Sequence, residues 1–271
     1  MSDQTPICEP CGLETLPAPE GEPVIRLVDV EKTLDGKKVL DGVTLDIPRQ
    51  RITAIIGLSG AGKSVMLKHM IGLIRPERGQ VLIDGVDISR LSREELYKVR
   101  RRFGMLFQGG ALFDSLTVFE NVAFPLQEKT DMGEGEIRER VLTRLAQVGL
   151  EEAQGKYPDE LSGGMVRRVA FARAMVMNPE IILFDEPTTG LDPIIRNSIL
   201  HLICHTYHQH GFTMVMISHD IPEIFQWSHH VVVLHDGKVI EAGPTAEVVS
   251  SVNPFVQQII RGDITGPVHL M

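Results

Sequence analysis

An α/β fold with a mixed sheet is predicted by three features of the 271-residue sequence. Short apolar, β-branched runs, such as residues 52–56 and 181–184, alternate with segments at helical spacing, the pattern of buried strands joined by helices. Two strands, at residues 24–31 and 39–47, precede the first of these runs and predict an antiparallel layer. Residues from about 112 to 176 are helical in pattern, which predicts a helical subdomain inserted into the core.

Composition and charge limit the classes of protein to consider. A hydrophobic share of 43% and a charged share of 23% are typical of a globular protein. The 27 basic and 36 acidic residues give a net charge of −9, which argues against a nucleic-acid partner. No apolar run approaches the roughly 20 residues that span a bilayer, so we expect any membrane role to be peripheral and to depend on a partner.

Three regions are expected along the chain. Residues 1–23 contain five prolines and neither Lys nor Arg, and we expect them to form a disordered acidic tail. Residues 24–261 carry the strand and helix patterns and form the predicted folded domain. Residues 262–271 follow the last predicted helix and form a C-terminal tail.

The first elements can be justified from local patterns. Apolar and polar residues alternate over positions 43–47, which predicts a strand with one buried face, and Asp35-Gly36 supplies the turn before it. Ser92 and Glu95 form a capping box that opens a short helix. The run Arg100-Arg101-Arg102 at the end of this helix is expected to be solvated.

A phosphate-binding loop lies between the buried strand 52–56 and a helix at 65–74. Its pattern, G-x-x-x-x-G-K-S, comprises Gly57, Leu58, Ser59, Gly60, Ala61, Gly62, Lys63 and Ser64. Glycines let the backbone wrap around phosphates, and the helix directs its positive end at the same anion. We expect Lys63 to reach the β- and γ-phosphates and Ser64 to bind Mg²⁺. The loop therefore predicts nucleotide binding.

The middle of the chain adds one strand and several helices. Residues 103–107 predict a strand that leads to Gln108. Thr117 and Glu120 form a second capping box, and residues 134–148 carry apolar side chains at helical spacing. A short strand is predicted earlier, at residues 80–83. The later predicted elements are a helix that follows Leu161-Ser162-Gly163-Gly164 and runs to Met177, a strand at 181–186, a helix at 194–210, a strand at 213–217, a hairpin of residues 231–234 with 238–242, and two short helices.

Two adjacent carboxylates complement the loop. Asp185 and Glu186 follow four apolar residues, a costly position without a cation nearby. Asp185 can hold Mg²⁺ opposite Ser64. Because side chains alternate along a strand, we expect Glu186 to point elsewhere and to act as a general base on an attacking water.

Together these motifs resemble those of ATP-binding-cassette (ABC) ATPases over about residues 25–250. The motifs are, in order, the loop 57–64, Gln108, Leu161-Ser162-Gly163-Gly164, Phe184-Asp185-Glu186-Pro187, Leu191-Asp192 and His219. The Leu-Ser-Gly-Gly signature, lying between the loop and the acidic strand, is the most specific of them.

The resemblance implies an ATP-hydrolysing homodimer with two ATP molecules at its interface. One subunit would supply the loop 57–64 with Gln108, Asp185, Glu186 and His219. The other would supply Ser162, Gly163 and Gly164 as a second anion cradle at a helix N-terminus. His219 would contact the γ-phosphate, Gln108 would lie near Mg²⁺ and the attacking water, and Asp192 would lie at the dimer seam.

One branch of the family matches more closely. Residues 105–113 and 117–126, and Met165 where the wider family usually has Gln, resemble the ATPase subunits of the Mla (maintenance of lipid asymmetry) and related MCE-associated transporters. This resemblance implies a phospholipid transporter at the inner membrane, with the ATPase on its cytoplasmic face. The implied partners are a permease, MCE-domain proteins and sometimes a STAS-domain protein. Leu34 stands where the family usually stacks an aromatic on adenine, so apolar contact from Leu34 or Val39 is the expected substitute.

Other interpretations share part of the same pattern. The apolar side chains of Leu112, Phe113 and Leu116 favour a groove for a permease helix over internal packing. An amino-acid or ion importer would share every catalytic residue, and only the branch-like segments disfavour it. A soluble ABC ATPase acting on ribosomes or DNA is disfavoured by the single cassette and the acidic charge.

Overall fold

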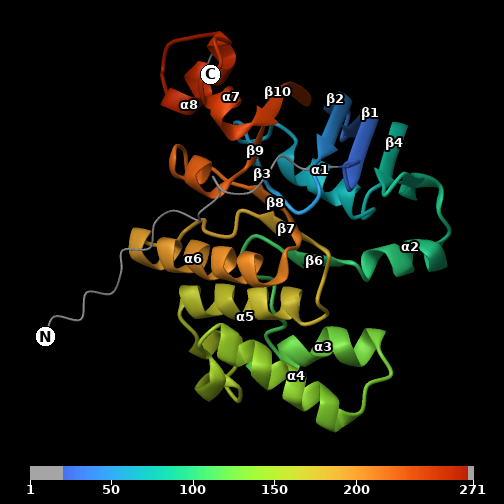
Figure 1. Cartoon of the computed structure of the whole chain (residues 1–271), viewed down its shortest axis with the longest axis vertical. Helices are drawn as coiled ribbons and strands as arrows, with labels where there is room; N and C mark the ends of the chain where they lie inside the picture. Colours follow the sequence, from blue (N-terminus) through green and yellow to red (C-terminus); the bar gives the residue numbers. More distant parts are fainter. Residues whose placement is uncertain (1–20, 268–271) are drawn as a thin grey trace, which may run out of the picture.

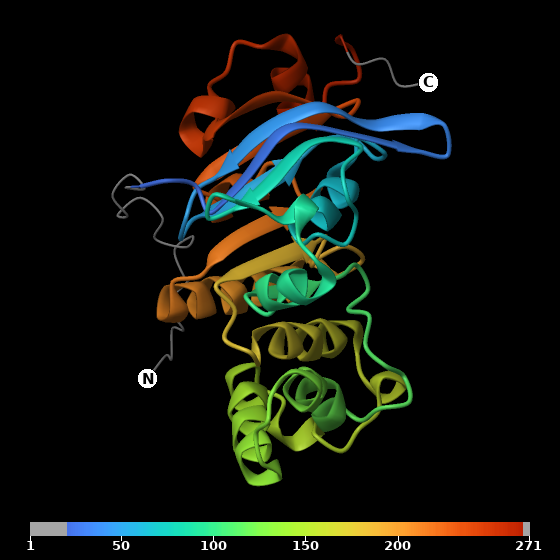
Figure 2. The same cartoon turned by 90° about the vertical axis from the view of Figure 1, so that its right-hand side faces the viewer.

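Two β-sheets form the upper part of the molecule, and a group of helices forms its lower end (Figures 1 and 2). The structure is a computed structural model that describes residues 21–267. Most of the expected N-terminal tail and the last four residues of the C-terminal tail therefore lie outside the described residues. Among the described residues, no helix combines the length and the apolar character needed to cross a membrane.

The antiparallel layer predicted from the sequence is present as a four-stranded sheet with the order β2-β1-β4-β5. Its strands are β1 (Ile25–Leu34), β2 (Lys37–Ile47), β4 (Arg78–Ile83) and β5 (Val86–Asp87). β1 runs three residues beyond its predicted end, because Leu34 pairs with Lys37 directly across the Asp35-Gly36 turn. Both turn residues have positive φ, 50° and 78°, which is the conformation of a two-residue hairpin.

The larger sheet has six strands in the order β10-β9-β3-β8-β7-β6. They are β3 (Ile52–Ile56), β6 (Phe103–Leu106), β7 (Ile181–Asp185), β8 (Thr213–Ile217), β9 (His230–His235) and β10 (Lys238–Pro244). Pairing is parallel from β6 through β9, and only β10 is antiparallel. Every residue of β3, β7 and β8 is buried, which explains why these strands are continuous apolar runs. The sheet is mixed, as predicted.

The helices form a second set of elements. They are α1 (Lys63–Met70), α2 (Arg93–Arg100), α3 (Val118–Lys129), α4 (Glu134–Gln147), α5 (Gly163–Met175), α6 (Pro193–His210), α7 (Thr245–Val249) and α8 (Pro254–Arg261). Helix α1 packs against both sheets, α5 packs against β6 of the large sheet, and α3 and α4 pack against α5. Ile55 faces the core shared with the antiparallel layer and α1, whereas Ala54 and Ile56 face the core shared with α5 and α6. Because side chains alternate along a strand, the large sheet contributes to one hydrophobic core on each of its two faces.

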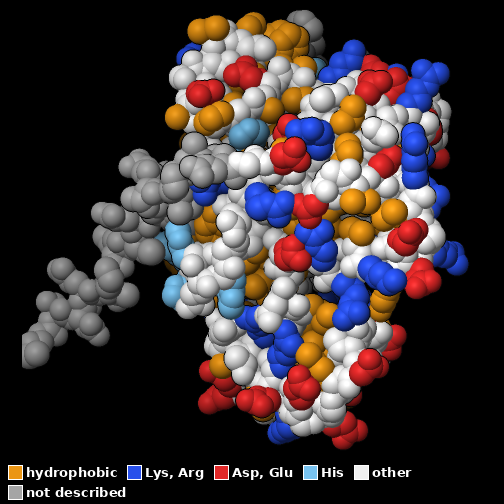
Figure 3. Space-filling view, turned by 45° about the vertical axis from the view of Figure 1, so that its right-hand side comes forward, with side chains coloured by type: hydrophobic (Ala, Val, Ile, Leu, Met, Phe, Trp, Pro, Cys, Tyr) orange, Lys and Arg blue, Asp and Glu red, His pale blue; other side chains and the backbone are white. Residues whose placement is uncertain are grey.

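The helical segment α3, α4 and α5 lies at the end of the molecule farthest from the antiparallel layer (Figure 2). Both predicted capping boxes are present, with Ser92 and Thr117 as the N-caps of α2 and α3. On the face shown in Figure 3, acidic side chains gather at this lower end, and Lys and Arg side chains lie across the middle. The net negative charge is therefore unevenly distributed.

The expectation of a solvated Arg100-Arg101-Arg102 run was wrong for two of the three residues. Arg100 donates hydrogen bonds to the carbonyls of Ile71 and Gly72 after α1. Arg102 donates to the carboxylates of Asp84, directly after β4, and Glu180, directly before β7, so it links strands of two different sheets. These arginines tie the antiparallel layer and α1 to the main sheet, which the local sequence could not reveal.

Candidate functional site

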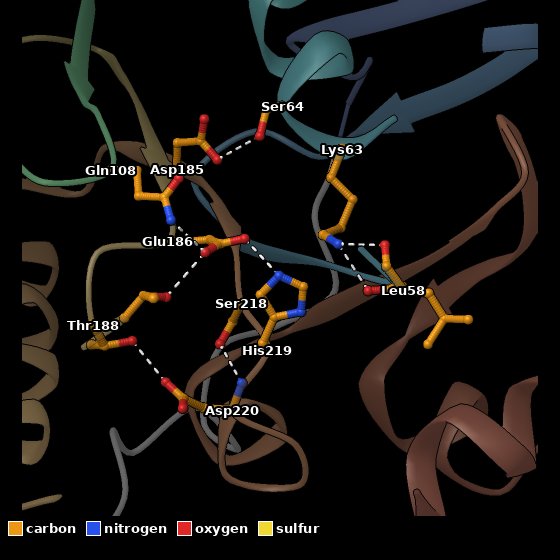
Figure 4. A network of polar contacts seen from close by, with 12 residues as sticks. Leu58, Lys63, Ser64, Gln108, Asp185, Glu186, Thr188, Ser218, His219 and Asp220 are labelled. Atoms are coloured by element: carbon orange, nitrogen blue, oxygen red, sulfur yellow. Dashed lines mark hydrogen bonds and ion pairs between the residues drawn. The ribbon is translucent and has the colours of Figure 1, made fainter. Parts of the chain in front are cut away.

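The carboxyl ends of four parallel strands bring the phosphate loop and four of the predicted site residues, Gln108, Asp185, Glu186 and His219, to one edge of the large sheet. The loop 57–64 follows β3, Asp185 ends β7, and His219 comes two residues after β8. The registers place Leu106 beside Phe184 and Asp185 beside Ile217, so Gln108 and His219 emerge on either side of Glu186. Figure 4 shows the resulting network.

Two glycines of the loop occupy positions that no other residue would fit. A Cβ atom at Gly57 would lie 2.1 Å from the Leu234 carbonyl oxygen, and one at Gly62 would lie 2.6 Å from that of Val39. Gly62 is also the N-cap residue of α1, with φ of 103°, and no side chain at this position accepts hydrogen bonds from the first N–H groups of the helix. The first N–H groups of α1 are therefore available to an anion.

Lys63 is almost fully buried at the start of α1. Its Nζ atom donates to the carbonyl oxygens of Gly57 and Leu58, at 2.8 and 2.9 Å. Burial lowers the pKa of this ammonium group, and the carboxylates of Glu186 and Asp185 oppose that shift. A phosphate would supply the nearby negative charge that a buried ammonium favours.

Ser64 and Asp185 meet across the site. The Ser64 hydroxyl donates to Asp185 Oδ1 over 2.9 Å. Burial raises the pKa of Asp185, the Ser64 hydrogen bond opposes this, and the neighbouring Glu186 raises it further. Hydroxyl and carboxylate oxygens are the ligands that Mg²⁺ prefers, so this pair fits that ion.

Glu186 is the centre of the polar network, but it does not point away from Asp185 for the reason predicted. β7 ends at Asp185, and Glu186 lies beyond it with φ of 52°, in the left-handed region. A turn of the backbone, and not the alternation of a strand, therefore sets the direction of its side chain. An unusual backbone angle at a non-glycine residue is frequent at functional sites.

Three side chains hold the Glu186 carboxylate. His219 Nε2 lies 2.6 Å from its Oε1 atom. Gln108 Nε2 and Thr189 Oγ1 donate to its Oε2 atom over 3.2 and 3.1 Å. A carboxylate fixed in this way beside the phosphate loop can accept a proton from a water molecule.

The signature residues lie elsewhere on the subunit. Ser162 is the N-cap of α5 and its Oγ accepts a hydrogen bond from the Met165 N–H. Ser162 and Gly163 are exposed, while Gly164 is buried against Ile195 of α6. Asp192 is the N-cap of α6 and accepts hydrogen bonds from the N–H groups of Ile194 and Ile195, a structural role that was not predicted.

Comparison with known proteins decides the family. The family described as "ABC transporter" matches residues 40–189 of the chain. The chain belongs to the ABC transporter family. The intermembrane phospholipid transport system ATP-binding protein MlaF of Haemophilus influenzae is 45% identical over 85% of this chain and 88% of its own length. MlaF of Escherichia coli K12 is 41% identical over 90% of this chain and 91% of its own length.

Further relatives of this ABC protein carry other names. The probable ribonucleotide transport ATP-binding protein mkl of Mycobacterium leprae is 41% identical over 91% of this chain and 71% of its own length. Among solved structures, the dimeric ATP-binding cassette MJ0796 bound to ADP and Pi aligns with a TM-score of 0.75, 35% identity, and 82% and 98% of the two chains. The cbiO1 protein of Clostridium perfringens aligns with a TM-score of 0.78, 31% identity, and 89% and 94% of the two chains. These matches confirm the predicted fold class and an ATP-hydrolysing subunit of a transporter.

Several polar residues around the ABC site were not predicted. Thr188 Oγ1 donates to Asp220 over 2.7 Å, and Arg196 of α6 donates to the same carboxylate over 2.9 Å. Thr189 contacts Glu186, and Arg167 of α5 reaches the Thr189 carbonyl oxygen. In the sequence, Thr188, Thr189 and Asp220 are marked only by their proximity to predicted site residues. The threonines follow Glu186-Pro187, and Asp220 follows His219.

Proposed function

We propose that this chain is the ATP-hydrolysing subunit of a transporter that moves phospholipids between the inner and outer membranes, bound peripherally to the cytoplasmic face of the inner membrane. The observation that carries the proposal is the 45% and 41% identity to two MlaF proteins over at least 85% of each chain. The polar network around Glu186 gives the ATPase part of the proposal a physical basis.

In this proposal each site residue has a distinct role. The loop from Gly57 to Ser64 surrounds the phosphates, and the Lys63 ammonium balances their charge. Ser64, Asp185 and Gln108 would hold Mg²⁺, which supplies charge stabilisation at the phosphates when bound. Glu186 is the general base, and His219 contacts the γ-phosphate while sharing the Glu186 carboxylate.

The proposed assembly is a head-to-tail homodimer in which each subunit completes the other's site. The dimeric cassette structure of MJ0796 supports this arrangement. Ser162 and Gly163 are exposed at the start of α5, where N–H groups are available to a phosphate of the partner's nucleotide. Asp192 would lie beside them at the seam.

A permease is the next proposed partner, and an MCE-domain protein and a STAS-domain protein are further proposed members of the same complex. Phe113 is 44% exposed and Phe124 is 36% exposed, and their rings pack 4.9 Å apart. Leu112, by contrast, packs against the internal core. The exposed aromatic pair beside the Gln108 loop thus supports a docking site for a membrane subunit.

Purification of the tagged chain from membranes of its native host tests the substrate. We expect a permease and MCE-domain proteins in fixed ratio, with bound phospholipid identified by mass spectrometry. Proteoliposomes of that complex should transfer labelled phospholipid with ATP, and a Glu186→Gln complex should not. A permease that carries nucleotides, amino acids or ions would contradict the phospholipid assignment, and co-purified ribosomes or DNA without a permease would contradict the transport role.

A further inference from the structure

The segment between Glu186 and α6 is held from both sides by hydrogen bonds to one residue, Thr189. The Thr189 hydroxyl donates to Glu186 Oε2 over 3.1 Å. The Thr189 carbonyl oxygen accepts a hydrogen bond from Arg167 Nη2, also over 3.1 Å. Thr189 therefore connects the proposed general base to α5, the helix that begins at the signature.

The signature also packs directly against this segment. A Cβ atom at Gly163 would lie 3.5 Å from the Leu191 side chain, and one at Gly164 would lie 2.6 Å from Ile195 Cγ2. The distance at Gly163 is an ordinary contact, but the closer packing at Gly164 leaves little room for α5 and α6 to move independently, because protein interiors are dense. A displacement of the start of α5 therefore has to be accommodated by residues 189–195.

The buried position of Arg167 is one at which an arginine contributes little to folding stability. The residue is 8% exposed, and its Nη1 atom has no hydrogen-bond partner within the part of the chain that the structure describes. An incompletely paired buried guanidinium costs free energy relative to an apolar side chain of similar size. Such a residue is better explained by what it connects than by the stability it adds.

We propose that Arg167 and Thr189 form a relay that positions Glu186 in response to the signature segment 162–164 of the same subunit. The inference rests on the proposed dimer, in which this signature contacts the nucleotide held by the partner's phosphate loop. Occupation of one site then shifts α5, and through Arg167 and Thr189 it adjusts the base of the other site. Arg167 and Thr189 are positioning residues, and their side-chain hydrogen bonds go to Thr189 and Glu186 and not to the phosphate loop.

The test measures ATP hydrolysis by the purified transporter complex over a range of ATP concentrations. We expect a wild-type Hill coefficient above 1, with an upper limit set by the two sites. Thr189→Val removes the hydroxyl donor, and Arg167→Met removes the guanidinium. Each should bring the coefficient close to 1 and reduce kcat about tenfold, because the base is held less accurately. ATP affinity measured with a fluorescent analogue should stay within about twofold, since the relay does not contact the loop.

Two matched variants and one double variant make the test specific. Thr189→Ser keeps the hydroxyl and should retain wild-type cooperativity. If Arg167→Met does not fold, the comparison of Thr189→Val with Thr189→Ser still tests the relay. Arg168→Met removes the neighbouring arginine, whose hydrogen bonds go to Val148 and Ser198, and should leave the coefficient unchanged. The double variant Arg167→Met/Thr189→Val should equal the more affected single variant, because both break one serial path.

Three results would overturn the relay: a wild-type coefficient of 1 in an active complex, wild-type cooperativity in Thr189→Val, or an equal loss in Arg168→Met. A wild-type complex that does not hydrolyse ATP would instead overturn the proposed function, and the relay with it. The wild-type rate therefore separates the failure of the relay from the failure of the function on which it rests.

Discussion

At the scale of single residues, the proposed chemistry depends on where the Glu186 carboxylate is held. Its carboxylate accepts from Gln108 and Thr189 and pairs with His219, so three separate segments fix one group. Asp185, one residue earlier, instead faces Ser64. Two adjacent carboxylates therefore have different partners, which suits one for a cation and the other for a proton.

Glu186→Gln is expected to retain ATP binding and to lower turnover by about 10²–10⁴-fold, because an amide cannot accept the proton from water. The measurement is steady-state ATP hydrolysis by the complete transporter, with nucleotide binding followed separately. Glu180→Gln, which changes a remote carboxylate paired with Arg102, is the matched control and should stay close to wild type. Near-normal hydrolysis by Glu186→Gln would remove Glu186 from the role of base.

At the scale of elements, one buried side chain fixes the loop after Gln108 to α3. Asn121 is fully buried, and its Nδ2 atom donates to the carbonyl oxygens of Phe113, Leu116 and Thr117. Its Oδ1 atom accepts from the Phe113 N–H over 2.8 Å. The exposed position of the Phe113 ring, proposed to receive the permease, thus depends on this amide.

Asn121→Ala should destabilise the protein by about 2–4 kcal/mol, because it leaves a cavity and several unpaired backbone groups. Denaturant unfolding measures this change, and hydrogen exchange should accelerate over residues 109–117. Gln127→Ala, at an exposed position of the same helix, should change stability by less than about 0.5 kcal/mol. Equal effects of the two variants would contradict the pinning role of Asn121.

A half-buried histidine, His229, binds the backbone at the start of β3 in a similar way. His229 Nδ1 accepts a hydrogen bond from the Ile52 N–H over 3.0 Å. Burial, the positive charge of Arg51 and the nearby His208 together lower the pKa of His229 to about 4, and burial is the largest of the three causes. The fold therefore favours the neutral imidazole.

The consequence is a stability that depends on pH. Between the unfolded pKa of about 6.5 and the folded value of about 4, the unfolded chain binds the extra proton, so stability falls as the pH is lowered through this window. After allowance for solvent screening, we expect a loss of about 2 kcal/mol from this residue. His229→Asn keeps an acceptor for Ile52 but does not titrate, so its unfolding free energy should fall less between pH 6.5 and 4. An unchanged pH dependence in the variant would contradict this assignment.

Much of the architecture could be predicted from the sequence, because local patterns dictate it. The strands around Ile55 and Leu183 are continuous apolar runs, and the loop and its helix carry a motif with a direct physical meaning. The direction of Glu186, the contacts of Arg102 and the burial of Arg167 could not be predicted in this way. Each depends on a partner distant in sequence, whose position exists only once the sheets and helices are packed.

At the scale of the whole molecule, the residues of the proposed site lie on two surfaces of the subunit. The phosphate loop and Glu186 lie at the carboxyl edge of the large sheet, whereas the exposed signature residues Ser162 and Gly163 begin α5. In the proposed dimer, the signature of each subunit therefore has to lie against the phosphate loop of the other subunit. Two variants, each inactive alone, can reveal whether they do.

The most direct measurement mixes Glu186→Gln subunits with Gly163→Glu subunits in the assembled transporter and records ATP hydrolysis. Gly163 has space for a side chain, since a Cβ atom there meets only Leu191 at 3.5 Å, but a carboxylate at this position would repel a phosphate. Each variant alone should be inactive. In a mixed dimer, the intact loop and base of the Gly163→Glu subunit meet the intact signature of the Glu186→Gln subunit, and the account predicts that activity returns. If the mixture stays as inactive as its components while mixed dimers are present, the signature does not complete the partner's site, and the central claim is wrong.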